Sequence, residues 1–472
     1  MRIVFYQGWP LRYAHVIVDG LRADHAADGT ICLWAEDDPA QVAGRDIGQL
    51  WRRLDEWAAA ARQGFRTEDR ALDAYVLFDN RSAWRSELPF NDLVEQGTNG
   101  FKTPLVASKQ GRTLLISPKN DASSEEGETL QGAFYLRNNI GPVPRHFDDI
   151  ARALTKKQSA DLAQGLANRA AVGAAEVSGG YDFIVLGWPR HDKEHDAVAV
   201  LIAGAGDELQ AEAMAASAND VTARRRRSGP DSDLLAGKTV LIAGAGSVGG
   251  HVAVALASSG VRNLRIHDDD DLTSANLVRH VAPTYAVGYR KVVGVSVAAE
   301  DHAPWVTVTS GDNLPGGATS LMTALEGVDL VIDCTGIFHV TATLAEVCRR
   351  TDRPLIVGAL FHQGALARVQ RQGKGDTLIA ARPANPAYLK LPPEDLTEPS
   401  GFLELGCTAP VNNAPPTSVL AAAADIAHAA VDYMTGRRER SDERIIVLRA
   451  MTAPFHRPGT LDSPGTNGGD AI

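Results

Sequence analysis

Cysteine is scarce in this sequence, and no two cysteines stand in C-x-x-C spacing. The 472 residues contain four of them: Cys32, Cys334, Cys348 and Cys407. Thiols so few and so scattered argue against a disulfide framework and against a four-thiolate zinc site. Cys334 and Cys348 fall in an expected strand and an expected helix of the core, which leaves Cys32 and Cys407 as candidates for chemistry.

The sequence also lacks long apolar runs and an excess of basic residues. It has no run of 18 apolar residues, and its first residues do not have the layout of a signal peptide, which argues against membrane insertion and secretion. The formal net charge is -11, with 47 Lys and Arg against 58 Asp and Glu, which argues against nucleic acid as the main partner. We therefore expect a cytoplasmic protein whose thiols stay reduced.

A glycine-rich segment in the second half is the strongest motif present. The apolar residues 240–243 predict a buried strand, and Gly244, Gly246 and Gly249 follow it as G-x-G-x-x-G. The first glycine permits a tight turn, the second lets the backbone approach a phosphate, and the third lets a helix over residues 247–259 pack on the strand. The N-terminus of that helix would face an anion.

Polar residues beyond the second expected strand favour a triphosphate over a dinucleotide. Asp268 follows Gly249 by about 20 residues, where an NAD-binding protein also keeps its ribose-binding acid. An NAD enzyme does not need the amide, guanidinium and ammonium that Asn276, Arg279 and Lys291 then supply. This set suits a triphosphate attacked at its α-phosphorus, because the charge that builds on the phosphoryl oxygens needs fixed cations.

The pattern D-x-D-x(5)-N-L-x-R followed by G-x-x-K, in residues 268–291, resembles the ThiF/MoeB adenylyltransferases and the adenylation domains of ubiquitin-activating enzymes. The resemblance covers roughly residues 235–451. It implies a Rossmann-like α/β domain that adenylates a protein C-terminal carboxylate with ATP and Mg²⁺ and that forms a homodimer. It also implies a nucleotide site with Asp268 and Asp270 at the ribose and Asn276, Arg279 and Lys291 at the phosphates.

One position departs from the family pattern. The family has D-C-T-D-N after its fourth strand, and the second aspartate helps to hold magnesium, whereas this chain has Asp333-Cys-Thr-Gly336-Ile. Either the metal is held differently, for example by the carboxylates of residues 268–271, or activity is reduced or lost. We expect an active enzyme because the other phosphate-site residues are present.

Two cysteines lie in surroundings that suit acyl transfer. The pattern H-x-x-x-G-x-I-C-L that begins at His25 resembles the active-site segment of ubiquitin-conjugating enzymes, also found fused ahead of bacterial adenylation domains. By that resemblance Cys32 would carry the activated protein as a thioester; a buried strand cysteine is the alternative. Cys407 follows the long polar segment 383–400, where activating enzymes often place their acceptor cysteine, and its loop setting favours exposure.

The length suggests two or three domains. Strands are expected over residues 2–6, 14–18, 74–78 and 377–381, and an amphipathic helix over residues 47–62. The expected division is a ubiquitin-conjugating-like α+β segment (1–80), a middle α/β region without an assigned role (81–222), a basic linker (223–234), the adenylation domain (235–455) and a disordered tail (456–472).

Together these patterns predict ATP-dependent adenylation of a protein C-terminal carboxylate, with thioester transfer through Cys407 and then Cys32 to an amine. The acyl donor would be a ubiquitin-like protein or another protein C-terminus, and relatives of this build occur in bacterial conjugation and antiphage operons. Three alternatives stay open. A sulfur-carrier adenylyltransferase would not use Cys32, an NAD-dependent oxidoreductase would use only the glycines, and an inactive scaffold would explain Gly336.

Overall fold

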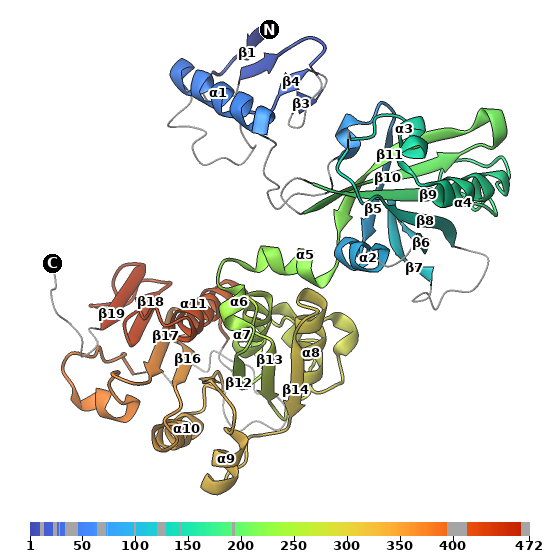
Figure 1. Cartoon of the computed structure of the whole chain (residues 1–472). Coiled ribbons are helices and arrows are strands. Elements are labelled where there is room, and N and C mark those ends of the chain that lie inside the picture. Colours follow the sequence, from blue (N-terminus) through green and yellow to red (C-terminus); the bar gives the residue numbers. More distant parts are fainter. Residues whose placement is uncertain are drawn as a thin grey trace. The chain divides into compact units, whose positions relative to one another are not determined.

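The computed structural model describes residues 1–9, 14–21, 26–27, 29–33, 46–63, 72, 74–98, 101–119, 129–141, 143–190, 194–393 and 413–463. The chain divides into two compact units, residues 1–224 and residues 225–472 (Figure 1). In the described part, no helix combines the length and the apolar character that crossing a membrane requires.

The first unit opens with a small antiparallel sheet and one helix. The sheet order is β1 (Arg2–Phe5), β2 (Ala14–Ile17), β4 (Thr30–Ile31) and β3 (Ala26–Ala27). Helix α1 (Ile47–Gln63) buries Leu50 against Val16 and Ile31 of the sheet. The two early strands and the amphipathic helix were expected, because alternating and helical apolar spacing are visible in the sequence.

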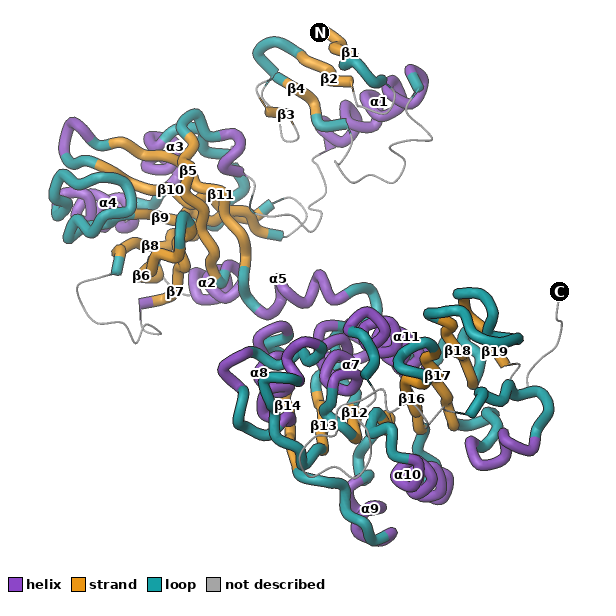
Figure 2. The backbone as a smooth tube through the Cα atoms, turned by 180° about the vertical axis from the view of Figure 1, so that it is seen from behind, coloured by secondary structure: helices purple, strands orange, loops and turns teal. Residues whose placement is uncertain are grey.

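Seven strands of the first unit close into a barrel, visible as the large group of orange strands in Figure 2. Their order around the barrel is β10 (His195–Ala203), β11 (Gln210–Ala218), β5 (Arg81–Leu88), β7 (Thr113–Pro118), β6 (Thr103–Gln110), β8 (Leu130–Leu136) and β9 (Phe183–Pro189). Along β10, Ala199 and Leu201 join a core to which all seven strands contribute, whereas Val200 and Ile202 face outward. This alternation fills the interior of the barrel.

Short helices surround the barrel strands. Ile150 of α3 (Phe147–Ala153) and Leu162 of α4 (Lys156–Ala167) pack on the outward-facing residues, and α2 (Phe90–Gly97) follows β5. The α/β arrangement expected for the middle region is not what the structure has: its strands form a closed barrel of antiparallel and parallel pairs, and short helices surround it. The expected strand over residues 74–78 is wrong: Ala74–Leu77 form the 3-10 helix η2. A short apolar run has no periodicity that separates the two structures.

The second unit is an α/β domain built on an eight-stranded sheet. The order is β14 (Thr307–Gly311), β13 (Asn263–His267), β12 (Thr239–Ala243), β15 (Leu330–Asp333), β16 (Leu355–Phe361), β17 (Leu366–Gln372), β18 (Glu443–Val447) and β19 (Gly459–Ser463). The first five strands run parallel, and the last three pair antiparallel. The chain reverses direction through the sheet between β12 and β15, where such folds leave a crevice at the carboxyl ends of the strands.

Helices cover both faces of this sheet. Val240 and Ile242 of β12 pack toward α7 (Ser247–Ser258), α8 (Lys291–His302) and α11 (Pro416–Met434). Leu241 and Ala243 pack on the other face, toward α9 (Ala318–Ala324) and α10 (Phe338–Arg350). The remaining helices are α5 (Val221–Arg225), α6 (Ser232–Leu235), η4 (Gly206–Glu208), η5 (Arg226–Ser228), η6 (Asn276–Val278), η7 (Thr284–Ala286) and η8 (Ile379–Ala384). The Rossmann-like α/β class expected for residues 235–455 is confirmed.

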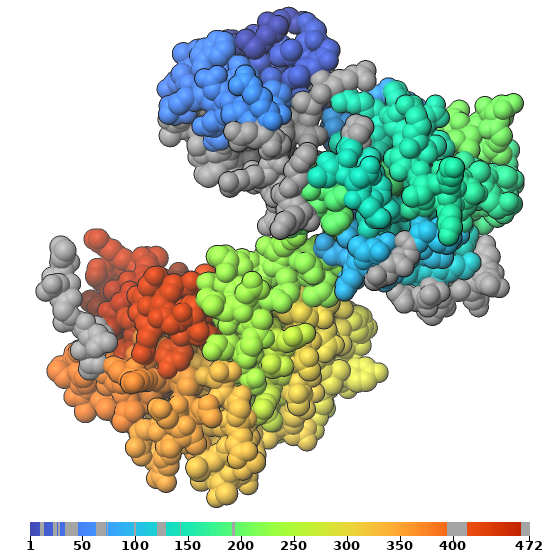
Figure 3. All heavy atoms as spheres, viewed as in Figure 1, coloured from blue at the N-terminus to red at the C-terminus, as the bar shows by residue number. Residues whose placement is uncertain are grey.

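Two expectations for the second unit are wrong. Residues 377–381 form no strand, because the chain curls into η8 around Arg382, whose buried guanidinium donates to the carbonyl oxygen of Thr377 at 2.8 Å. The tail expected to be disordered from residue 456 contains β19, which pairs Leu461 with Ile445 of β18. The atoms of this C-terminal part lie on one side of the second unit in Figure 3.

Candidate functional site

The glycine-rich turn after β12 has the geometry that its spacing predicts. Gly244 has φ +91° and donates its N–H to the carbonyl of His267 at 2.8 Å. A Cβ on Gly249 would lie 1.9 Å from the carbonyl oxygen of Gly244, so only glycine allows α7 to start this close to β12. A Cβ on Gly246 would meet no atom within 4 Å, and Gly246 caps α7 without a side-chain hydrogen bond. Open space therefore lies at the N-terminus of α7, where an anion is favoured.

Acidic and basic side chains meet beside this turn. The Asp268 carboxylate accepts the N–H of Ala245 at 2.7 Å and the N–H of Asp270 at 2.9 Å. Burial is the largest influence on this carboxyl group and raises its pKa. Lys291, whose side chain is only 11% exposed, donates its Nζ to Asp270 at 2.6 Å. The structure thus brings the predicted residues Asp268, Asp270 and Lys291 together at the glycine turn.

Asn276 and Arg279 belong to the loop that includes η6. The side-chain oxygen of Asn276 accepts the N–H and the hydroxyl of Thr273, at 2.9 and 3.0 Å, which fixes the start of η6. Arg279 follows η6, donates to the carbonyl of Ala414 at 3.4 Å, and lines a pocket together with Ser247 of the glycine turn. The guanidinium therefore belongs to the same pocket that Ser247 of the nucleotide-type turn lines.

His280 is a site residue that sequence reasoning missed. It is buried, its Nε2 lies 2.8 Å from the carbonyl oxygen of Ala245, and its Nδ1 accepts the N–H of Ala282 at 3.1 Å. Because Nδ1 is an acceptor, Nε2 carries the proton and donates to Ala245 inside the glycine turn. Burial lowers the pKa of His280, which favours this neutral form. The sequence shows a histidine directly after N-L-x-R, but it does not show that this histidine contacts the glycine turn.

The position of the missing metal carboxylate is open. Gly336 has φ +67°, and a Cβ there would meet no atom within 4 Å. Asp333 does not replace the lost group: its buried carboxylate accepts the N–H and hydroxyl of Thr335, at 2.9 and 2.7 Å, and the hydroxyl of Thr341 at 2.5 Å. The carboxylates of Asp268, Asp269 and Asp270 form an oxygen cluster within 4.8 Å in the described part of the chain. Such oxygens suit Mg²⁺.

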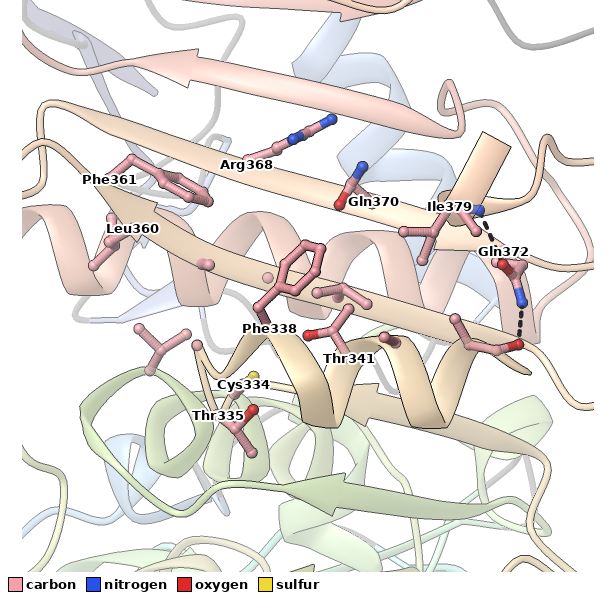
Figure 4. A pocket seen from close by; sticks show the side chains of 18 of the residues that line it. Cys334, Thr335, Phe338, Thr341, Leu360, Phe361, Arg368, Gln370, Gln372 and Ile379 are labelled. Atoms are coloured by element: carbon pink, nitrogen blue, oxygen red, sulfur yellow. Dashed lines mark hydrogen bonds between the residues drawn. The ribbon is translucent and has the colours of Figure 1, made fainter. Parts of the chain in front are cut away.

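A pocket of about 860 Å³ adjoins the glycine turn within the second unit. Ser247, Arg279 and Thr335 line it on the side of the turn. Its other walls come from α10, β16, β17 and η8, and Figure 4 shows the side chains that face it. They include the apolar residues Phe338, Leu360, Phe361 and Ile379 and the polar residues Arg368 and Gln370. Its size is in the range of pockets that enclose a small organic ligand or a short peptide segment.

The three cysteines that the structure describes differ in exposure as expected, with Cys334 and Cys348 in the core and Cys32 exposed. Cys348 is buried in α10, and burial raises its pKa to about 12. Cys334 follows β15 and borders the pocket, and burial raises the pKa of its thiol strongly. Cys32 follows β4 and is exposed. Cys407 lies outside the described residues. The two core thiols are therefore held in their unreactive protonated form.

Comparison with known proteins fits this geometry. The model of the ThiF family matches residues 227–463, about half of the chain and nearly the whole second unit. The chain belongs to the ThiF family. Its membership confirms the Rossmann-type adenylyltransferase fold expected from residues 268–291.

Individual relatives share part of the chain. The molybdopterin-synthase adenylyltransferase of Escherichia coli strain K12 is 27% identical over 49% of this chain and 87% of that protein. The ATP-dependent ubiquitin transferase-like protein Cap2 of Enterobacter hormaechei subsp. hoffmannii is 25% identical over 62% of this chain and 44% of its own. The crystal structure of E. coli MccB with ATP is 16% identical, with a TM-score of 0.40, over 52% of this chain and 72% of that one. The chain covers only 24% and 33% of two further curated relatives.

Proposed function

We propose that this protein uses ATP to adenylate the C-terminal carboxylate of a protein or peptide. The observation that carries the proposal is that Arg279 lines the 860 Å³ pocket together with Ser247 of the glycine turn. A carboxylate in the pocket and a triphosphate at the turn would both lie next to this cation. Adenylation requires that arrangement, because one carboxylate oxygen must reach the α-phosphorus.

The residues at the turn fit a triphosphate. The open space over Gly246 and the N-terminus of α7 suits phosphate oxygens, which accept backbone N–H groups there. Asp268 and Asp270 would face the ribose and its surroundings, and Asn276, Arg279 and Lys291 would face the phosphates. Lys291 now pairs with Asp270 at 2.6 Å, so a phosphate would compete with a carboxylate for the same ammonium.

Mg²⁺ remains part of the proposal although Gly336 stands where the family keeps a carboxylate. Asp269 and Asp270 offer the hard oxygen ligands that Mg²⁺ prefers, and Asp333 does not, since its oxygens already accept three hydrogen bonds. Bound Mg²⁺ would neutralise charge on the phosphates. The protein's own cations, Arg279 and Lys291, would supply the rest of that neutralisation.

The proposed adenylation step balances in atoms and in charge. A donor carboxylate oxygen bonds to the α-phosphorus, the bond to the leaving pyrophosphate breaks, and an acyl adenylate forms. Charge grows on the phosphoryl oxygens during this step, and Arg279 would stabilise it. The anhydride then holds the acyl group in activated form for a thiol.

The later transfer steps are the finer part of the proposal. We propose Cys407 as the first acyl acceptor and Cys32, which is exposed after β4, as the second. A ubiquitin-like protein is the donor class that this relay suits, and the similarity to a ubiquitin transferase-like relative supports it. A sulfur-carrier adenylyltransferase is the second candidate, supported by the similarity to the molybdopterin-synthase adenylyltransferase. A homodimer and a cytoplasmic location are part of the same proposal.

Calorimetric titrations with ATP and with NAD, both in the presence of Mg²⁺, test which nucleotide the protein binds. We expect binding of ATP, and loss of ATP–pyrophosphate exchange by about 100-fold to 1,000-fold in Arg279→Ala. The matched control is Arg350→Ala, which removes an exposed arginine of α10 that pairs with Glu346. Binding of NAD without binding of ATP would refute the proposal, and so would full exchange by Arg279→Ala.

A further inference from the structure

Two arginines that line the pocket pair with carboxylates, the buried Glu443 and the exposed Glu346. Arg368 of β17 donates its Nη2 to both oxygens of Glu443, at 3.0 and 2.9 Å, and Gln370 donates to the same carboxylate at 2.6 Å. Glu443 lies on β18 and is completely buried. Further along the wall, Arg349 makes two hydrogen bonds of 2.9 Å to Glu346. An acidic ligand side chain near Arg368 would therefore meet a guanidinium that is already paired with a carboxylate.

Arg368 keeps hydrogen-bonding capacity on the pocket side. A guanidinium has five N–H donors, and Glu443 engages those of Nη2. The side chain is 22% exposed and lines the pocket, so it can donate to a ligand there. Figure 4 shows Arg368 and Gln370 next to each other on β17, where both line the pocket. A balanced guanidinium beside an amide suits neutral carbonyl oxygens, such as those of a peptide backbone.

Several other lining residues of the pocket are apolar, and they include a strongly exposed phenylalanine. Phe338, at the start of α10, is 87% exposed, and Figure 4 shows its ring directed into the pocket. Leu360, Phe361 and Ile379 add apolar surface. A ligand side chain that covers this surface removes it from water, which favours binding in proportion to the area buried. A donor tail made only of glycines would leave this apolar surface exposed to water.

We infer that the acyl donor carries a bulky uncharged side chain a few residues before its C-terminal carboxylate. That side chain packs against Phe338 and its apolar neighbours, and Arg368, held by Glu443, binds a backbone carbonyl next to it. The carboxylate itself points to Arg279 on the side of the glycine turn. The inference rests on the proposed function and adds the chemical class of the donor tail.

Synthetic heptapeptides with free C-terminal carboxylates test the inference. Three series place Phe, Glu or Gly at the second, third or fourth position from the end, with alanine elsewhere, and each peptide carries an N-terminal fluorophore. Fluorescence anisotropy gives Kd with ATP present and with ATP absent. In the wild type, we expect the best Phe peptide to bind at least 10-fold more tightly than its Glu and Gly counterparts.

Four variants separate the parts of this recognition. Phe338→Ala should reduce the preference for Phe to less than threefold, whereas Leu234→Ala, which removes an exposed leucine on α6, should leave it unchanged. Glu443→Gln should shift the preference toward the Glu peptide, because the charge of Arg368 is then uncompensated. If Glu443→Gln does not fold, Arg368→Met tests the same pair in a different way: it removes the donor to the backbone carbonyl and should weaken all three peptides.

The outcomes distinguish this inference from the proposed function. Equal affinity for the Phe, Glu and Gly peptides overturns the inference even when ATP binds, and so does the absence of any peptide binding at millimolar concentration. A preference for Glu in the wild type overturns it as well. Failure to bind ATP, measured by calorimetry on the same protein, overturns the proposed function instead, whatever the peptide preference.

Discussion

Two alanine substitutions in the glycine turn should separate packing from nucleotide binding. In Gly249→Ala, the new Cβ would lie 1.9 Å from the carbonyl oxygen of Gly244 and 3.2 Å from the Cβ of Cys334. The first contact is between backbone and Cβ, so α7 must move away from β12. Overpacking of this kind costs about 3 kcal/mol, and the better helix propensity of alanine returns about 1 kcal/mol, so we expect a net loss of about 2 kcal/mol.

Gly246→Ala is the matched control. Its Cβ would meet no atom within 4 Å, and φ is -69°, which alanine adopts without strain. Alanine is a poorer N-cap than glycine, so a loss of at most about 1 kcal/mol is expected. The methyl group would, however, occupy the space through which a phosphate approaches the backbone, and ATP affinity should fall at least about 10-fold.

Scanning calorimetry of the full chain and titration with ATP measure both effects. For a domain of this size, about 2 kcal/mol lowers Tm by roughly 4–8 °C. The reasoning is refuted if Gly249→Ala melts with the wild type. It is also refuted if Gly246→Ala loses as much stability as Gly249→Ala, or if it binds ATP as the wild type does.

Four further outcomes are expected. Burial lowers the pKa of His280 in the folded protein, so neutral His280 stabilises the fold fully above about pH 6.5. This contribution is lost as pH falls toward the lowered folded pKa. The free energy of unfolding should therefore fall less steeply with decreasing pH in His280→Gln than in the wild type. Asp333→Ala should cost about 3 kcal/mol in thermal unfolding, because it leaves two threonine hydroxyls without their buried acceptor. On non-reducing gels with ATP and donor, Cys407→Ala should stop every thioester, whereas Cys32→Ala should block only the final conjugate; full conjugate from Cys32→Ala would make the N-terminal segment a docking module. Light scattering should give a homodimer, and a monomer at working concentration would contradict that prediction.

The nucleotide-type turn could be predicted because its signals are local. Gly244, Gly246 and Gly249 stand within one strand-turn-helix unit, and their spacing alone requires the close approach that the structure has. Asp268 and Lys291 follow along the next strand and helix, so the topology of a parallel sheet brings them to the same edge. The local sequence pattern and the usual handedness of the connection between parallel strands were sufficient to predict this part of the site.

The pocket could not be predicted, because it depends on pairings between distant segments. Arg368 and Glu443 are 75 residues apart and meet only because β17 pairs with β18. The contact of His280 with the glycine turn joins residues 35 positions apart. Neither contact leaves a periodic or compositional signal in the sequence. The same is true of the closed barrel, in which β5 pairs in parallel with β7 and β11.

Closure of the barrel restricts how other proteins can engage this part of the first unit. Each of the seven strands has a hydrogen-bonded neighbour on both sides, so the barrel has no free strand edge. A partner that docks by adding a strand therefore has no place to join it, and recognition there must use side chains and connecting loops. The eight-stranded sheet of the second unit differs, because its outer strands β14 and β19 each have one neighbour among the described residues. Two copies of this protein could therefore pair strand edge to strand edge at the eight-stranded sheet, but not at the barrel.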